Sequence, residues 1–116
     1  MATMRTHFLL LIVAVLVAPL AAQWGEPGGW TPIKDLSDPH LKEIVDFAIS
    51  EYNRKSNASL KLNSVVEGET QVVEGMNYHL IVTVANGAAL ERYEAVVWEM
   101  PWQHFISLTS FSRLGF

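Results

Sequence analysis

The residues best suited to catalysis in this chain are its histidines, because an imidazole can take up and release a proton near neutral pH. Three of the four lie in the body of the chain, at His40, His79 and His104. They fall at the start of an expected helix, inside an expected strand and after an expected loop, so no pattern groups them with a serine and a carboxylate. No pair has metal-ligand spacing. Isolated surface histidines are the simpler interpretation, so we expect neither an enzyme nor a cofactor.

The absence of cysteine limits the chemistry further. Among 116 residues there is none, which excludes a cysteine nucleophile, thiolate metal sites and disulfides. Apolar burial alone must therefore stabilise the fold, which a chain of this length can do with a modest margin.

Recognition by apolar side chains is a second kind of chemistry, and the segment Gln71-Val72-Val73-Glu74-Gly75 indicates it. It lies between two expected strands, 60–66 and 78–85, and should form the tip of a β-hairpin. Gly75 can supply the positive φ that such a tip needs. Two adjacent valines at a normally polar position suggest a surface that a partner covers. The alternative is that the valines extend the strands towards the core, and spacing alone does not separate the two.

A second apolar connection, Pro101-Trp102, interrupts the last pair of expected strands, 93–100 and 103–112. Asn86-Gly87 is a strong turn signal between 78–85 and 93–100. In an up-and-down sheet alternate connections share one end, so Pro101-Trp102 should lie beside the 71–75 tip. A contiguous exposed apolar surface usually marks an interface.

Residues 23–32 combine Gly25, Pro27, Gly28, Gly29 and Pro32 with two tryptophans. This composition disfavours helix and most strand pairing, so we expect a mobile arm over 23–32. Of its tryptophans we expect Trp30 to fold back onto the sheet, whereas the position of Trp24 stays open. With Gly28-Gly29 at the same end as the two apolar connections, the three segments would form a wedge.

One helix is predicted over 39–55. Asp38 is a good N-cap and Pro39 suits the first turn. Apolar residues recur at three- and four-residue steps along one face, at Leu41, Ile44, Val45, Ala48 and Tyr52. A helix followed by four hairpin-connected strands predicts an α+β fold, with the helix packed across one face of an antiparallel sheet. The turn after the helix contains Asn57-Ala58-Ser59, an N-glycosylation sequon with Asn57 as the acceptor.

The first 22 residues have the features of a secretory signal peptide: a basic start, an apolar run from Phe8 to Val17 and an alanine-rich end. We expect cleavage near Ala22, a single mature domain over 23–116, a secreted protein and no membrane partner after cleavage. Arg5 is the one charged residue of the leader, so 7 basic and 12 acidic residues would remain, a net charge of −5. Without a basic stripe, nucleic acid is not an expected partner.

Four motifs in this order resemble those of the plant cystatins, or phytocystatins, which inhibit papain-like cysteine proteases. Gln71-Val72-Val73-Glu74-Gly75 resembles the family's Gln-Val-Val-Ala-Gly, Gly28-Gly29 its paired glycine, and Pro101-Trp102 the Pro-Trp of its second loop. Phe47-Ala48-Ile49-Ser50-Glu51-Tyr52-Asn53 is similar to the helix signature of the plant branch. The resemblance covers nearly all of the expected mature chain.

The resemblance implies an antiparallel sheet wrapped around one long helix, and a wedge that enters a protease cleft. Inhibition would be reversible and competitive, because no peptide bond is presented to the catalytic thiolate in attack geometry. It also implies a secreted protein, extracellular or vacuolar, with a role in plant defence. Glu74 stands where the family has alanine, so a binding module without inhibitory activity is the alternative. We expect a monomer; exchange of hairpins into a swapped dimer is a hypothesis that size-exclusion chromatography after mild heating would test.

Overall fold

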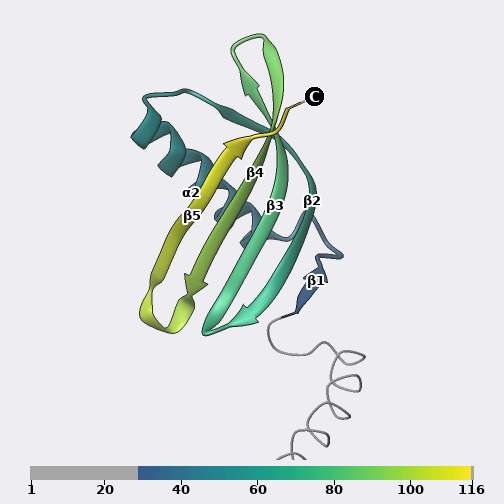
Figure 1. The fold of residues 1–116 in the computed structure, drawn as a ribbon, viewed down its shortest axis with the longest axis vertical. Coiled ribbons are helices and arrows are strands. Elements are labelled where there is room, and N and C mark those ends of the chain that lie inside the picture. Colours follow the sequence, from purple (N-terminus) through teal and green to yellow (C-terminus); the bar gives the residue numbers. More distant parts are fainter. Residues whose placement is uncertain (1–28, 116) are drawn as a thin grey trace, which may run out of the picture.

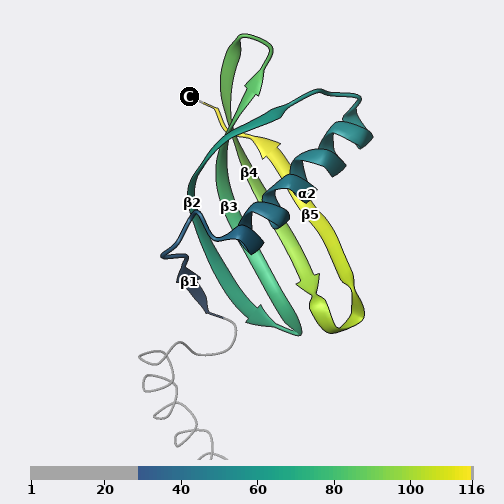
Figure 2. The same cartoon turned by 180° about the vertical axis from the view of Figure 1, so that it is seen from behind.

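The computed structural model describes residues 29–115 as one helix packed on one antiparallel sheet, in the strand order β1-β2-β3-β4-β5. Figures 1 and 2 show the helix crossing one face of the sheet and leaving the other face open. The predicted α+β architecture is thereby confirmed. The elements are β1 (Trp30–Pro32), α2 (Pro39–Ser56), β2 (Lys61–Val73), β3 (Gly75–Asn86), β4 (Ala89–Met100), the 3₁₀ turn η1 (Pro101–Gln103) and β5 (Phe105–Arg113).

Capping residues set both ends of helix α2. The Asp38 carboxylate accepts the backbone N–H of His40 at 2.8 Å, and Pro39 occupies the first turn, where no N–H is needed. Asn57 ends the helix in the left-handed conformation. The buried residues of α2 are Leu41, Ile44, Val45, Ala48 and Ile49. Tyr52, predicted on the same face, is half-buried against the rings of Tyr93 and Phe111.

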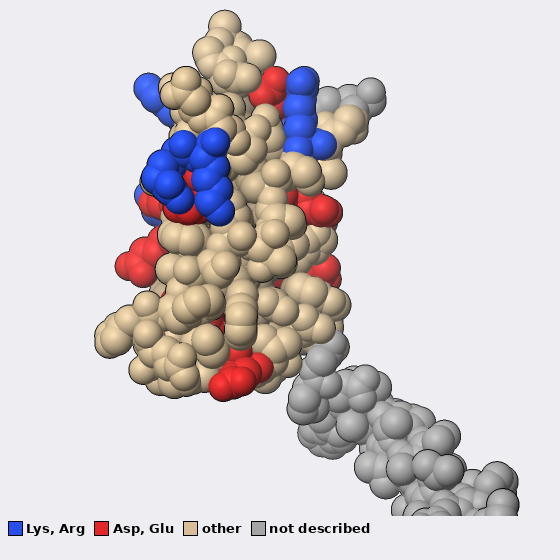
Figure 3. All heavy atoms as spheres, turned by 60° about the vertical axis from the view of Figure 1, so that its left-hand side comes forward, with Lys and Arg blue, Asp and Glu red and all other residues tan. Residues whose placement is uncertain are grey.

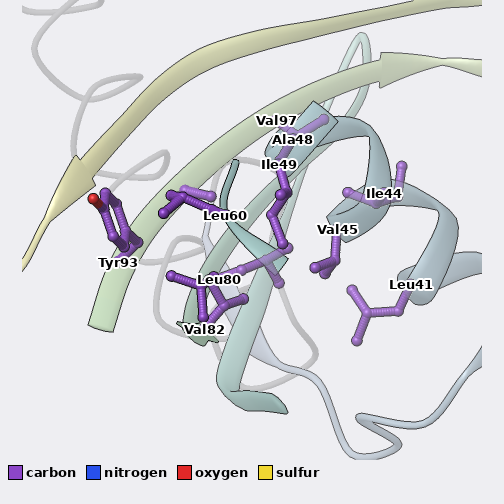
Figure 4. Packing of buried hydrophobic residues seen from close by; sticks show 12 residues of the cluster. Leu41, Ile44, Val45, Ala48, Ile49, Leu60, Leu80, Val82, Tyr93 and Val97 are labelled. Atoms are coloured by element: carbon purple, nitrogen blue, oxygen red, sulfur yellow. The ribbon is translucent and has the colours of Figure 1, made fainter. Parts of the chain in front are cut away.

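The core lies between α2 and the inner face of the sheet (Figure 4). Strand alternation places every second side chain of β3 and β4 there. The residues that β3 and β4 contribute to the core cluster are Leu80, Val82, Val84, Tyr93, Ala95 and Val97. Each fully buried aliphatic side chain contributes about 1.5–3 kcal/mol. Apolar burial in this layer supplies the stabilisation that disulfides provide in many small secreted domains.

Strands β2 and β3 are longer than the sequence predicts. Their pairing continues through Thr70↔Tyr78 and Gln71↔Asn77 to Val73↔Gly75, so the hairpin tip is Glu74 alone. The prediction ended the strands early because this segment is polar and rich in turn formers. Cross-strand hydrogen bonds override that local preference. Two bulges in β2 reset the register on the way, between Leu62 and Ser64 and between Val65 and Glu67.

Strand β1 corrects the prediction of a mobile arm that extends to Pro32. Trp30, Thr31 and Pro32 pair with Gln71, Thr70 and Glu69 of β2. Pro32 lies at the end of an edge strand, where a proline is tolerated. Residues 23–28, and with them Gly28, lie outside the described residues. Within 29–115 no helix is long and apolar enough to cross a membrane.

Candidate functional site

Three segments distant in sequence meet at one end of the sheet, at the lower end of Figure 1. Trp30 pairs with Gln71, which places Gly29 beside the end of β2. The Trp98 indole Nε1–H donates to the backbone carbonyl of Glu74 at 2.8 Å, which ties the β2–β3 tip to β4. The loop that begins at Pro101 follows β4 directly. The structure thus brings together Gly29, the 71–75 tip and Pro101-Trp102, as the sequence predicts, and leaves Gly28 undescribed.

The β2–β3 tip requires glycine at position 75. Gly75 has φ +90°, and an added Cβ would lie 2.1 Å from the backbone oxygen of Glu99. The tip is therefore pressed directly against β4, with no room for a side chain between them. This close approach fixes the position of the backbone that carries Val72 and Val73.

The two valines of the tip belong to β2 but do not reach the core. Val72 is 54% exposed and Val73 is 38% exposed. Both predicted alternatives are therefore partly right: the residues extend a strand, and their side chains still face solvent. Exposed β-branched side chains on a fixed backbone lose little entropy when a partner covers them.

The β4–β5 loop presents Trp102. Pro101 begins the 3₁₀ turn η1, and His104 ends it with φ +50° while its N–H donates to the carbonyl of Pro101 at 3.0 Å. A positive φ at a non-glycine residue is uncommon and is held here by this bond. Met100, just before the loop, is buried, whereas Trp102 is 61% exposed. The turn therefore anchors one end of the loop and projects the indole into solvent.

Exposed apolar side chains concentrate at this end of the molecule. Of the seven large hydrophobic residues that are most exposed in the described structure, five belong to the three segments or their immediate neighbours: Trp30, Val72, Val73, Trp102 and Phe105. On the face shown in Figure 3, lysine and arginine atoms gather towards the opposite end, and the lower end is mostly uncharged with one acidic group. An apolar, weakly charged end is suited to docking in a hydrophobic cleft.

Two residues that support the site were not predicted to do so. Trp98 donates to the tip and packs edge-on against Phe105, with ring centroids 5.2 Å apart. Glu99 accepts from Tyr78 and lies 2.8 Å from His40 Nε2, which ties the start of α2 to β4 just before the loop. Strand alternation places Trp98 on the outer face correctly, but no sequence signal identifies its partner 24 residues away.

The pKa shifts near the site reflect these structural contacts. Burial, followed by the Glu99 carboxylate, raises the pKa of Tyr78 to about 12. The hydrogen bond with Glu99 raises the pKa of His40 above its ordinary value. His40, His79 and His104 lie in three separate environments, and within 29–115 no group of His, Asp or Glu side chains could hold a metal ion.

Comparison with known proteins identifies the family. Residues 33–114 match the family model described as an aspartic acid proteinase inhibitor. The chain is 46% identical over 112 residues to cysteine proteinase inhibitor 5 of Arabidopsis thaliana, covering 94% of this chain and 92% of the relative. It is 47% identical over 87 residues to cysteine proteinase inhibitor 1 of Actinidia chinensis, covering 75% of each.

Solved structures support the same family. The salivary cystatin of the soft tick Ornithodoros moubata superposes with a TM-score of 0.68 at 28% identity, covering 77% of this chain and 99% of that one. The family model and the plant relatives differ in the protease class they name but share proteinase inhibition. The fold, the plant relatives and the ordered motifs agree, and this chain belongs to the cystatin family of proteinase inhibitors, among its plant members.

Proposed function

We propose that this protein is a reversible competitive inhibitor of papain-like cysteine proteases. The convergence of Gly29, the 71–75 tip and the Trp102 loop at one end of the sheet is the observation that carries the proposal. We expect the three segments to act together as a wedge, and the large side chains most exposed among them are apolar. The plant relatives are named cysteine proteinase inhibitors, which supports this protease class over the aspartic class.

The anchoring of the tip supports inhibition without cleavage. The Glu74 carbonyl accepts the Trp98 indole N–H, and Gly75 rests against the backbone of β4. A protease nucleophile would need that carbonyl to turn towards its oxyanion hole, which would break the bond and lift the tip from β4. We therefore expect the wedge to block the cleft while its own backbone stays intact.

A titration of papain with the full chain tests the proposal. We expect stoichiometric loss of papain activity, with intact inhibitor recovered after dissociation. A parallel titration of pepsin tests the aspartic class. Inhibition of pepsin alone would overturn the proposal. Absence of inhibition in both would favour a cystatin-fold binding module, and hydrolysis of a substrate panel by the chain itself would indicate an enzyme.

Glu74 is the position where this chain departs from the cystatin pentapeptide, and its side chain is exposed at the tip. We propose that the carboxylate stays at the rim of the protease cleft, where water and salt screen it. Glu74→Ala should then change the inhibition constant for papain by less than about tenfold, or ~1.4 kcal/mol. Inhibition kinetics at low and high salt measure this. A hundredfold gain in affinity would instead show a buried, obstructive carboxylate.

We also propose that the protein is secreted and carries an N-linked glycan at Asn57. Asn57 is exposed at the left-handed end of α2, and Ser59 of the sequon is exposed as well. In Figures 1 and 2 this end of the helix lies away from the β2–β3 tip and the β4–β5 loop, so a glycan would leave the wedge uncovered. Protein secreted by a eukaryotic host should lose mass on endoglycosidase treatment, and Asn57→Gln should remove that loss. Unmodified secreted protein would contradict the proposal.

A further inference from the structure

Strand β1 is a short edge strand, and just beyond it the Ile33 N–H donates to the carbonyl of Gly68 at 2.9 Å while its side chain packs against the core. The pairing of β1 with β2 comprises three residue pairs, and Pro32 in the last of them has no N–H to donate. The indole of Trp30 adds a side-chain contact on the outer face of the sheet, in a T-shaped arrangement with the imidazole of His79, with ring centroids 5.9 Å apart. Trp30 is still 42% exposed. Because Gly29 directly precedes Trp30, the contacts that hold Trp30 on the sheet also restrict the position of Gly29.

His79 is itself held by a carboxylate on each side. Its Nδ1 lies 2.8 Å from Oε1 of Glu69 on β2, and its Nε2 lies 2.9 Å from Oε2 of Glu94 on β4. A neutral imidazole has one N–H, so two hydrogen bonds to ionised carboxylates require the charged imidazolium. The geometry is therefore that of a positive charge that bridges three strands beneath Trp30.

The other charged groups around His79 are few. Glu67 of β2 lines the same groove of about 270 Å³, together with Pro32 and Ile33 from the β1 side. Arg92 lies two residues before Glu94, hence on the same face of β4. The hydrogen-bond partners of His79 are therefore carboxylates from both neighbouring strands, Arg92 is the basic residue further along β4, and the Trp30 ring contacts the imidazole from β1.

We infer that His79 is a positioning residue for the amino-terminal segment of the wedge: as an imidazolium between Glu69 and Glu94 it holds Trp30, and through Trp30 it fixes Gly29 beside the β2–β3 tip. This inference rests on the proposed function, because it assigns the contact a role in inhibition. When His79 loses its proton, one of its two hydrogen bonds breaks and Trp30 loses its cationic neighbour. The two carboxylates then face a neutral ring, and one of them belongs to Glu69, the β2 residue that pairs with Pro32.

The pH window follows from the direction of the shift. Hydrogen bonds, first with Glu94 and then with Glu69, raise the pKa of His79 above its ordinary value near 6.5, against an opposing effect of burial. A raised pKa in the folded state gives stabilisation that is complete below about pH 6.5 and is lost as the pH rises through the raised value. Strand β1 should therefore be held more firmly on the sheet in acidic media and less firmly in alkaline media.

Nuclear magnetic resonance of the free full chain tests the positioning step without any protease. The Trp30 indole N–H and the Thr31 amide are followed from about pH 5 to about pH 9. The chemical shifts of both groups should follow the titration of His79 in the native protein and in His40→Gln. In His79→Gln neither chemical shift should change over this range. His40 is a matched control because a carboxylate also raises its pKa, whereas its ring contacts Tyr78. Titration of Trp30 that persists in His79→Gln, or none in the native protein, would overturn the inference.

Dissociation from papain tests the functional step. At about pH 5.5, His79→Gln should dissociate about three- to tenfold faster than the native chain, and at about pH 8.5 the two rates should converge. Deletion of residues through Gly29 should remove the difference at about pH 5.5, because the segment that His79 positions is then absent. A difference that survives the deletion would show that His79 acts elsewhere. If the native chain does not inhibit papain, the proposed function fails, whereas the resonance test still decides the positioning step.

Discussion

Gly75→Ala is expected to lower the free energy of unfolding by about 3 kcal/mol or more and to abolish tight inhibition of papain. The residue has φ +90°, which an alanine adopts only under strain, and the new Cβ would lie 2.1 Å from the backbone oxygen of Glu99. Because that atom belongs to a central strand, no side chain can move aside to relieve the clash. The tip must lift from β4, which also breaks the bond between Trp98 and the Glu74 carbonyl.

Gly87→Ala provides the matched control for this prediction. Gly87 also has a positive φ, +61°, but an added Cβ would meet nothing within 4 Å. Its substitution should cost about 1 kcal/mol, the conformational term alone, and leave inhibition unchanged. Urea unfolding followed by circular dichroism measures both variants. Equal destabilisation of the two would show that the contact with Glu99 does not constrain the tip.

The sequence predicts the positive φ of Gly75 but cannot predict the contact that makes it indispensable. Valine-rich flanks and a glycine are local signals, and they placed this hairpin correctly. The pressing of Gly75 against Glu99 depends on the register of β3 with β4, which pairs Met76 with Glu99 across a long hairpin. Such a register emerges from the whole sheet, and no local spacing encodes it.

The prediction of a mobile arm was wrong for β1 for a related reason, although Trp30 does fold back onto the sheet as expected. The Gly- and Pro-rich composition of 23–32 correctly indicates that the segment has little intrinsic preference for a strand. What local composition omits is that β2 offers an unpaired edge and that His79 offers Trp30 a contact. Tertiary partners thus order three residues that propensity alone leaves disordered.

The supporting residues of the site show the same limit. Alternation along β3 and β4 predicts which side chains face outwards, and Trp98 and His79 do so. It does not predict that a carboxylate from each adjacent strand meets His79, because those partners are 10 and 15 residues away in the chain. The residues proposed to contact a protease are therefore easier to recognise from the sequence than the residues that hold them in place.

Trp102→Ala is expected to raise the inhibition constant for papain about a hundredfold, or ~2.7 kcal/mol, mainly through faster dissociation. A tryptophan side chain buried in a cleft removes roughly 150–250 Å² from water, worth on the order of 4–6 kcal/mol before the cost of ordering. In the free protein Trp102 is 61% exposed on a 3₁₀ turn closed by His104. The substitution should therefore leave the unfolding free energy within about 0.5 kcal/mol of the native value.

Leu90→Ala is the control for Trp102, because Leu90 is also 61% exposed but lies near the β3–β4 turn, at the other end of the sheet. It should leave the inhibition constant unchanged, which separates contact with the protease from a general loss of apolar surface. Progress curves with papain give the association and dissociation rates of both variants. If Trp102→Ala were to inhibit as well as the native chain, the β4–β5 loop would lie outside the contact surface. The wedge would then consist of the β2–β3 tip and the amino-terminal segment alone.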